Sequence, residues 1–211
     1  MRLIGMLDSP YVRRVAISLD LLGVLFEHEA LSVFSTFEQF QRINPVVKAP
    51  TLICADGEVL MDSSLILQFI EANAMSGRSL WPTDSLERQH DFRVLGLALA
   101  ACDKCVQLVY ERNLRPQAAQ HEPWIQRVTS QILAAFVALE QEIKNRQAVF
   151  AQAQTQAAIT SAVVWRFTQS MLADIVRDEN YPLLVKLSDR LENTAAFRKY
   201  LPVGPGVPAS N

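Results

Sequence analysis

The sequence contains few of the residues that build disulfide frameworks and metal sites. Its 211 residues include only 3 cysteines and 3 histidines. An odd number of cysteines does not suggest the disulfide framework of a secreted domain. Zinc would need two ligands beyond Cys102 and Cys105, and the histidines show no pair with matching spacing (His28, His90, His121). We therefore expect no metal, and we interpret the Cys102-Asp-Lys-Cys105 motif as ordinary residues of a helix.

Long hydrophobic runs and a strong charge of one sign are also missing. No stretch approaches the roughly 18 apolar residues of a membrane-spanning helix. Asp8, Arg13 and Arg14 interrupt the apolar start that a signal peptide would need. A net charge of −2 argues against a general nucleic-acid surface, while 50% hydrophobic residues suffice for one large or two modest domains. These properties predict a soluble cytoplasmic protein that binds neither membranes nor nucleic acids.

The first polar motif follows an apolar run, residues 2–7, that predicts a buried strand. Serine is a favoured residue just before a helix, and proline is tolerated at the first helical position, so Ser9 and Pro10 predict a helix start. Apolar residues then recur at helical spacing as far as Leu22, and Gly23 predicts the end of the helix. Such a turn directs the Ser9 hydroxyl and free backbone N–H groups toward one point, which suits an anion such as a thiolate.

The second polar motif is Asn-Pro-Val-Val-Lys-Ala-Pro, which ends at Pro50. Proline cannot donate to a sheet ladder, so Pro50 belongs at the start of the apolar strand that follows it. A cis bond before Pro50 would turn the backbone N–H and C=O of Ala49 outward, ready to pair with an extended peptide ligand. In the alternative interpretation, Pro50 only interrupts a loop. The sequence leaves both open.

The third polar motif, Asp62-Ser63, follows a predicted hairpin. Asp56-Gly57 is a strong turn signal between two short apolar runs, and the chain after Ser63 has the apolar pattern of a helix. In a ligand site, Asp62 would hold an ammonium group, while Ser63 and the helix N-terminus would hold a carboxylate. Alternatively, both residues only cap the helix.

In this order and at these intervals, the three motifs resemble those of the glutathione S-transferase superfamily, and most of all its bacterial serine-type members. The motifs are strand-Ser-Pro-helix, Asn-Pro-x-x-Lys-x-Pro and Asp-Ser-x-x-Ile. The resemblance covers most of the chain and implies an α/β plus all-α architecture. It predicts a thioredoxin-like βαβαββα glutathione-binding domain over residues 1–76, a linker over 77–84 and an all-helical domain over 85–211.

The pattern beyond the linker predicts a series of helices and a loose C-terminal tail. The expected helices cover about 85–115, 123–148, 155–175, 181–192 and 194–200. The tail, rich in proline and glycine, begins near residue 202.

The resemblance implies an enzyme that activates glutathione, its co-substrate, as a thiolate for attack on a small hydrophobic electrophile, and that forms a homodimer. It assigns the following roles toward glutathione: Ser9 to the thiol, the Ala49 backbone before Pro50 to the cysteinyl unit, Lys48 to the glycyl carboxylate, and Asp62 with Ser63 to the γ-glutamyl end. The electrophile is expected between the two domains, and the aromatic candidates for its pocket are Tyr11, Phe34, Tyr110 and Trp165. Tyr11 and Tyr110 rank first, because the resemblance puts both near that cleft.

A single hydroxyl is sufficient for the role assigned to Ser9. Lowering a thiol pKa by roughly two pH units requires about 2.7 kcal/mol of preference for the charged form. One hydrogen bond to a charged group supplies about 1.5–3 kcal/mol, and a helix N-terminus adds about 0.3–1 kcal/mol. Ser9 would therefore donate a hydrogen bond to the thiolate and never act as the nucleophile.

Three positions depart from the family pattern. Val47 stands where relatives usually have glycine, and Asp8 puts an acid beside the thiolate site. Thr155-Gln-Ala-Ala158 keeps only half of the capping box that relatives carry at the start of a buried central helix. These departures keep open a non-catalytic, transferase-like binding or regulatory protein. A disulfide-exchanging member is a third option, but such members normally carry cysteine where Ser9 stands.

Overall fold

The structure, a computed structural model, describes residues 1–73 and 77–209 and divides into two compact units. Of the described residues, the first unit contains 1–73, 77–80 and 194–206, and the second contains 81–193 and 207–209. The C-terminal segment 194–206, expected from the sequence to belong to the helical domain, thus joins the N-terminal unit. The predicted domain boundary at residue 76 lies outside the described residues.

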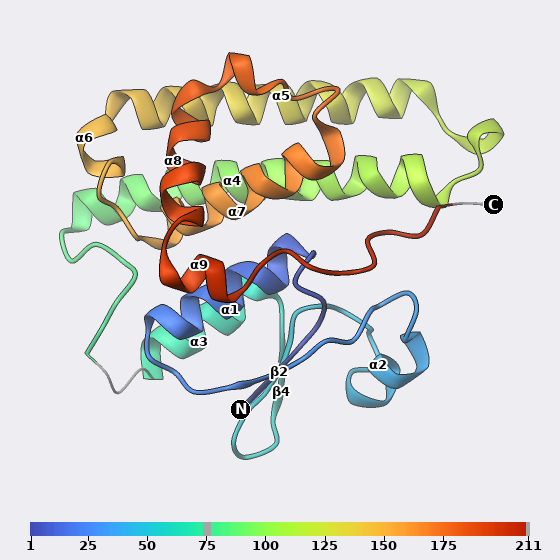
Figure 1. The fold of residues 1–211 in the computed structure, drawn as a ribbon, viewed down its shortest axis with the longest axis horizontal. Coiled ribbons are helices and arrows are strands. Elements are labelled where there is room, and N and C mark those ends of the chain that lie inside the picture. Colours follow the sequence, from blue (N-terminus) through green and yellow to red (C-terminus); the bar gives the residue numbers. More distant parts are fainter. Residues whose placement is uncertain (74–76, 210–211) are drawn as a thin grey trace. The chain divides into compact units, whose positions relative to one another are not determined.

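The first unit is built on a four-stranded mixed sheet in the order β2-β1-β3-β4. Its elements are β1 (Arg2–Ile4), α1 (Pro10–Leu21), β2 (Glu27–Glu29), α2 (Phe37–Ile43), β3 (Thr51–Ile53), β4 (Val59–Met61) and α3 (Ser63–Asn73). Strand β1 runs parallel to β2 and antiparallel to β3, which in turn is antiparallel to β4. Helices α1 and α3 lie side by side on one side of the sheet and α2 on the other (Figure 1). The βαβαββα order implied by the resemblance is confirmed.

The connection from β1 to α1 is longer than the sequence predicts. The predicted strand over residues 2–7 ends at Ile4, because Gly5 has a φ of +138°, which side chains rarely allow. A Cβ on Gly5 would also lie 2.6 Å from the side chain of Val12, in the first turn of α1. At the other end of the helix, Gly23 has a φ of +72° and ends it as predicted.

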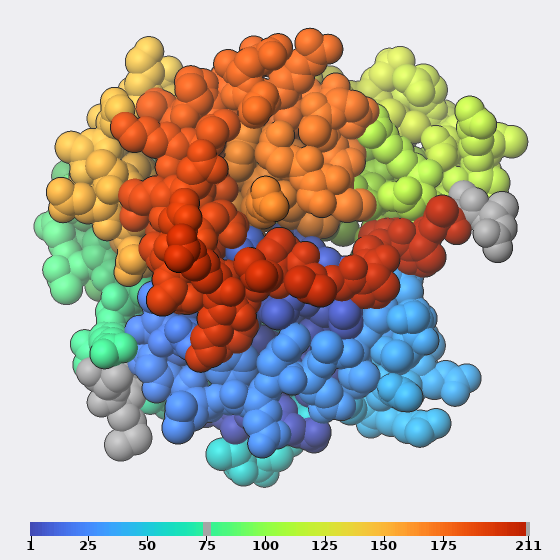
Figure 2. All heavy atoms as spheres, viewed as in Figure 1, coloured from blue at the N-terminus to red at the C-terminus, as the bar shows by residue number. Residues whose placement is uncertain are grey.

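The C-terminal segment packs on α1 within the first unit. It contains the short helix α9 (Ala195–Lys199), and the Arg13 side chain donates a hydrogen bond to the Tyr200 carbonyl oxygen at 2.8 Å. The same guanidinium lies 5.4 Å from the centre of the Phe197 ring, and Lys199 forms an ion pair with Asp20. In the space-filling view the red atoms of this segment lie directly on blue atoms of the N-terminal region (Figure 2).

The second unit is all-helical. Its helices are α4 (Ser85–Leu114), α5 (Glu122–Asn145), α6 (Gln147–Phe150), α7 (Gln156–Leu172) and α8 (Pro182–Glu192), with single 3₁₀ turns at Gln117–Ala119 and Asp178–Asn180. Helix α4 packs on α5 and α7, and α8 packs on α7 and α5. The predicted helix over 123–148 is interrupted at Arg146, which separates α5 from α6. No helix in the described part of the chain is long and apolar enough to cross a membrane.

Helix α7 is mostly buried, and its first turn is completed by a distant residue. The Thr155 hydroxyl oxygen accepts the Ala158 N–H at 3.4 Å and donates to Asp91 Oδ1 at 2.6 Å. The other oxygen of Asp91, which comes from α4, accepts the Ala157 N–H at 3.4 Å. Burial raises the pKa of Asp91 above its ordinary value, against the hydrogen bonds from Thr155 and Ala157. Asp91 therefore supplies the carboxylate that the half capping box lacks.

Candidate functional site

The three polar motifs all emerge at the same end of the sheet. Ile4, Thr51 and Met61 are paired in register across β1, β3 and β4. Because β3 runs antiparallel to both neighbours, the residues that follow β1, precede β3 and follow β4 lie at the same end of the sheet. The turn before α1, the loop that ends at Pro50 and the start of α3 are therefore brought together.

The Ser9 side chain is not used to cap α1. Its backbone is extended, with φ −70° and ψ 121°, and its carbonyl oxygen accepts the Arg13 N–H at 2.9 Å. The hydroxyl makes no capping hydrogen bond, and no other described residue bonds to it. The residue is partly exposed. The predicted helix start is confirmed, and the Ser9 hydroxyl is available to a ligand.

The peptide bond between Ala49 and Pro50 is cis. A Cβ placed on Gly5 would lie 3.2 Å from the Ala49 Cβ, so the Ala49 side chain lies close to the Gly5 backbone after β1. Within residues 1–73 and 77–209, no group hydrogen-bonds to the backbone N–H or C=O of Ala49. These backbone groups can therefore pair with an extended ligand, as an added strand would.

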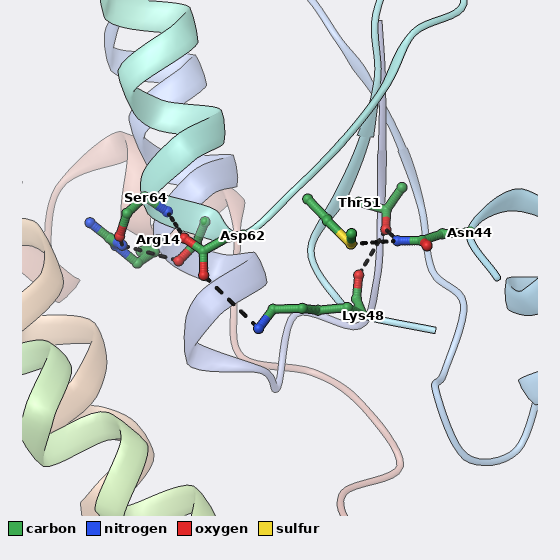
Figure 3. A network of polar contacts seen from close by, with 8 residues as sticks. Arg14, Asn44, Lys48, Thr51, Asp62 and Ser64 are labelled. Carbon is green, nitrogen blue, oxygen red and sulfur yellow. Dashed lines mark hydrogen bonds and ion pairs between the residues drawn. The ribbon is translucent and has the colours of Figure 1, made fainter. Parts of the chain in front are cut away.

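The start of α3 presents a charged and a hydroxyl side chain. Asp62 has a φ of +71°, and its Oδ1 accepts the Ser64 N–H at 2.9 Å. Its Oδ2 lies 4.0 Å from the Lys48 Nζ, and the two side chains are 46% and 53% exposed (Figure 3). A pair at this distance in solvent contributes little to stability, so both groups remain open to ligand charges. Ser63 is the first residue of α3 and is 3% exposed.

Arg14, which the sequence did not single out as a site residue, joins α1 to the start of α3. Its guanidinium donates from Nη1 to the hydroxyl oxygens of Ser63 and Ser64, each at 3.1 Å (Figure 3). The side chain is 2% exposed. An arginine on the buried side of an apolar helix is unusual. The apolar pattern around Arg14 was therefore the feature of the sequence that could have indicated its role.

A buried polar network holds the loop in front of Pro50. The Asn44 side chain donates to the Thr51 hydroxyl at 2.9 Å, and that hydroxyl donates to the Lys48 carbonyl oxygen at 2.7 Å (Figure 3). The Asn44 Oδ1 accepts the Val46 N–H, and its carbonyl oxygen accepts the Val47 N–H. Val47 has a φ of +53°, in the left-handed region. The loop thus places a β-branched residue in a backbone conformation that favours glycine.

Replacing Val47 with glycine should therefore stabilise the protein by about 1 kcal/mol. A β-branched residue in the left-handed region costs about 1–2 kcal/mol, of which glycine's greater freedom in the unfolded chain offsets a part. Urea denaturation measures the change. Val46→Gly is the matched control, because Val46 is 63% exposed and does not have a positive φ. We expect Val46→Gly to be mildly destabilising; an equal loss for both variants would contradict the strain at Val47.

The Asp8 carboxylate is turned toward the C-terminal segment. Its Oδ2 accepts the Gly206 N–H at 2.8 Å, and a side chain at Gly204 would occupy the position of the carboxylate itself. The acid beside Ser9 is therefore engaged by backbone from residues 204–206, a part of the tail that the sequence predicts to be loose.

The other predicted residues are distributed over both units. In the first unit, Tyr11 and Phe34 are partly exposed. In the second unit, Tyr110 is 38% exposed, but Trp165 belongs to the core, with its ring 5.6 Å from that of Phe136.

The cysteines of the Cys102-x-x-Cys105 motif lie on α4, within the second unit, and both are buried. Burial raises the pKa of Cys105 to about 12, so its thiol stays protonated at neutral pH. This agrees with the interpretation of the motif as helix residues without redox chemistry.

Comparisons with known proteins agree with this geometry. The family described as glutathione S-transferase, N-terminal domain, matches residues 3–77. The uncharacterized GST-like protein YibF of Escherichia coli is 31% identical over 140 residues, which cover 66% of this chain and 68% of YibF. Glutathione S-transferase U10 of Arabidopsis thaliana is 33% identical over 80 residues, 38% of this chain and 34% of that protein.

Solved structures match nearly the whole chain. A glutathione transferase family member from Pseudomonas fluorescens with bound glutathione superposes with a TM-score of 0.83 and 26% identity, covering 96% of this chain and 99% of that one. A glutathione S-transferase from Methylobacterium radiotolerans in complex with glutathione sulfonate gives a TM-score of 0.82 and 26% identity, covering 100% and 95%. From its sequence relatives, its fold and the positions of its three motifs, this chain belongs to the glutathione S-transferase superfamily.

Proposed function

We propose that this protein is a glutathione transferase that binds glutathione on its first unit and directs the ionised thiol at a small hydrophobic electrophile. The observation that carries the proposal is that three groups lie at the same end of the sheet. They are the Ser9 hydroxyl, which does not cap α1, the unpaired backbone of Ala49, and the start of α3 with the Asp62 carboxylate. Glutathione offers a thiol, a peptide backbone and a zwitterionic γ-glutamyl group in a matching order. The solved relatives with bound glutathione or glutathione sulfonate support this choice of ligand.

Each part of glutathione has a proposed partner. Ser9 donates to the thiolate, and the Ala49 backbone before Pro50 pairs with the cysteinyl unit. The ammonium and carboxylate of the γ-glutamyl unit bind to Asp62 and Ser63, respectively. Lys48, whose side chain is half exposed, takes the glycyl carboxylate.

The electrophile is proposed to contact Tyr11 and Tyr110, and the working form is proposed to be a cytoplasmic homodimer. Leu65 and Phe69 on α3 are 61% and 38% exposed, apolar surface that a second subunit would cover. Light scattering at twice the mass of the 23.7 kDa chain would support the dimer, and the mass of a single chain would contradict it.

The test of the function is calorimetric titration with glutathione, followed by turnover measurements with a panel of aryl halides, peroxides and activated alkenes. We expect saturable binding and conjugation of at least one electrophile. Binding without turnover across the panel would favour a transferase-like binding protein. Absence of binding at millimolar glutathione would contradict the proposal.

Replacing Asp62 with asparagine should weaken glutathione binding about tenfold. The variant keeps an oxygen that can accept the Ser64 N–H but loses the charge that pairs with the ligand ammonium, worth about 1.4 kcal/mol for a partly exposed pair. Asp56→Asn is the matched control, since within the described residues Asp56 accepts a single hydrogen bond, from the Glu58 N–H in an exposed hairpin turn. Calorimetry should give the wild-type affinity for the control. Equal affinities for the two variants would remove Asp62 from the site.

A further inference from the structure

The turn that carries Ser9 has few contacts of its own. Residues 6–9 are all partly exposed, and the Ser9 N–H donates to the Met6 carbonyl oxygen at 3.2 Å. Within the described residues, Asp8 has the only side chain of this turn that forms a hydrogen bond, and its partner is the Gly206 N–H at 2.8 Å. This contact ties the turn to a residue 198 positions further along the chain.

Two glycines of the C-terminal segment fit the Asp8 carboxylate, each for its own reason. Gly206 has a φ of +70°, which side chains rarely adopt, and in this conformation its N–H reaches Asp8. Gly204 does not have a positive φ, but a Cβ at this position would overlap the carboxylate. The glycines that make this segment look loose in the sequence therefore allow its backbone to approach Asp8 closely.

The segment that reaches Asp8 is itself fixed along α1. Helix α9 packs on α1 (Figure 1), and beyond it the Tyr200 carbonyl oxygen accepts a hydrogen bond from Arg13. Near the last turn of α1, Lys199 forms an ion pair with Asp20, and the Tyr200 ring stacks on Phe26 at 5.7 Å. The C-terminal segment thus follows α1 from its last turn back to the residue before Ser9.

The Ser9 backbone is therefore held from both sides. On the helix side, its carbonyl oxygen accepts the Arg13 N–H at 2.9 Å, and on the other side Asp8 is held by Gly206. A carboxylate accepts an N–H more strongly than a neutral oxygen does. Such support matters for a hydroxyl that must meet a sulfur, because an error of about 1 Å in position can reduce a rate by about 100-fold.

We propose that Asp8 is a positioning residue, which through its hydrogen bond with Gly206 holds the Ser9 hydroxyl in place for the thiolate. Asp8 acts through Ser9 and does not contact the ligand. The inference rests on the proposed function, since it concerns the same thiolate. It gives the acid beside the thiolate site a supporting role, and it makes the C-terminal segment a required part of that site.

The test compares two ways of breaking the contact. Asp8→Ala removes the acceptor, whereas Gly204→Ala pushes the segment off the carboxylate without changing a side chain of the turn. In both variants we expect the pKa of bound glutathione, followed by thiolate absorbance, to rise by about one pH unit and kcat/KM at neutral pH to fall about tenfold.

Val203→Ala is the matched control, since Val203 belongs to the same segment and is 67% exposed. It should titrate as wild type does. If Asp8→Ala fails to fold, Gly204→Ala carries the test. A wild-type thiol pKa in Gly204→Ala would overturn the proposal.

The sign of the change in Asp8→Ala separates position from charge. Removing a nearby negative charge would by itself favour the thiolate and lower the pKa of the thiol. A rise must therefore come from the lost position of Ser9, and a fall would overturn the proposal. Asp8→Asn keeps an oxygen that can accept the Gly206 N–H, so its kcat/KM should fall only about threefold. Equal losses in Asp8→Asn and Asp8→Ala would also overturn the proposal.

A double-mutant cycle tests whether Gly204 acts through Asp8. Both substitutions break the same contact, so the double variant should be no less active than the more damaged single variant. Losses that multiply would mean that Gly204 acts elsewhere, against the proposal.

Hydrogen exchange at the Gly206 amide tests the contact in the absence of glutathione. We expect slow exchange in wild type and faster exchange in Asp8→Ala, and equally fast exchange in both would overturn the proposal. If the amide is protected but wild-type protein binds no glutathione, the proposed function fails and the role of Asp8 with it. If wild-type protein ionises glutathione and the Asp8→Ala and Gly204→Ala variants do so at the same pH, only the role of Asp8 is wrong.

Discussion

Ser9→Ala should lower kcat/KM for glutathione conjugation by about 10- to 150-fold and should leave the protein folded. The hydroxyl is expected to donate to the thiolate, and a hydrogen bond to a charged group is worth about 1.5–3 kcal/mol, which gives this range of rates. The helix N-terminus remains in the variant, so the residual activity should exceed that of glutathione in water. Steady-state kinetics with the best electrophile of the panel measures the effect.

The fold should survive because the Ser9 hydroxyl contributes nothing to it. No described residue bonds to that hydroxyl, so the free energy of unfolding of Ser9→Ala should differ from that of wild type by less than about 0.5 kcal/mol. Ser35→Ala is the matched control: Ser35 is an exposed turn residue of the same unit. It should match wild type in both rate and stability. Full activity in Ser9→Ala would show that the thiolate is held by another group.

Asp91→Ala should lower the free energy of unfolding of the second unit by about 2–3 kcal/mol. Asp91 receives hydrogen bonds from the Thr155 hydroxyl and the Ala157 N–H, at the first turn of a helix that is mostly buried. Removing it leaves both donors without their acceptor in a site that water does not reach easily, and each unsatisfied group costs about 1–3 kcal/mol. Urea denaturation followed by circular dichroism measures the loss.

The control for Asp91 lies on the same helix. Asp103 is exposed, and its interactions with Lys104 and Gln107 are at the surface of α4. Asp103→Ala should change stability by less than about 0.5 kcal/mol. If Asp91→Ala were as harmless as this variant, Thr155 alone would cap α7 and the contribution from α4 would be wrong.

Local patterns predicted several turns of the first unit, whereas its βαβαββα order was predicted from the family resemblance. Ser9-Pro10, Asp56-Gly57 and Gly23 specify their turns through backbone preferences of single residues, which the sequence displays directly. The apolar runs beside these turns predicted single strands and helices, but β2 and α2 followed only from the resemblance. The length of β1 was not predicted: the strand ends at Ile4, and a Cβ on Gly5 would lie too close to Val12, a residue on another element.

Long-range contacts account for what the sequence could not reveal. The carboxylate that caps α7 comes from Asp91, which is 64 residues away from Thr155. The tail from residue 202 is predicted to be loose because of its proline and glycine content, yet the Gly206 N–H donates a hydrogen bond to Asp8, near the other end of the chain. In the sequence, Arg14 is one of two adjacent charges in an amphipathic helix, and its hydrogen bonds to Ser63 and Ser64 of α3 become visible only in the folded structure. Such pairings depend on the completed fold.

The most direct test of the account is the ionisation of bound glutathione, followed by the ultraviolet absorbance of its thiolate as pH is raised. A free cysteine thiol has a pKa near 8.5, and we expect the pKa of the bound thiol to lie about two pH units lower. In Ser9→Ala most of that decrease should disappear, although the ligand remains bound. A bound thiol that titrates at the same pH as free glutathione would contradict the central claim, that the hydroxyl at the start of α1 holds the sulfur as a thiolate.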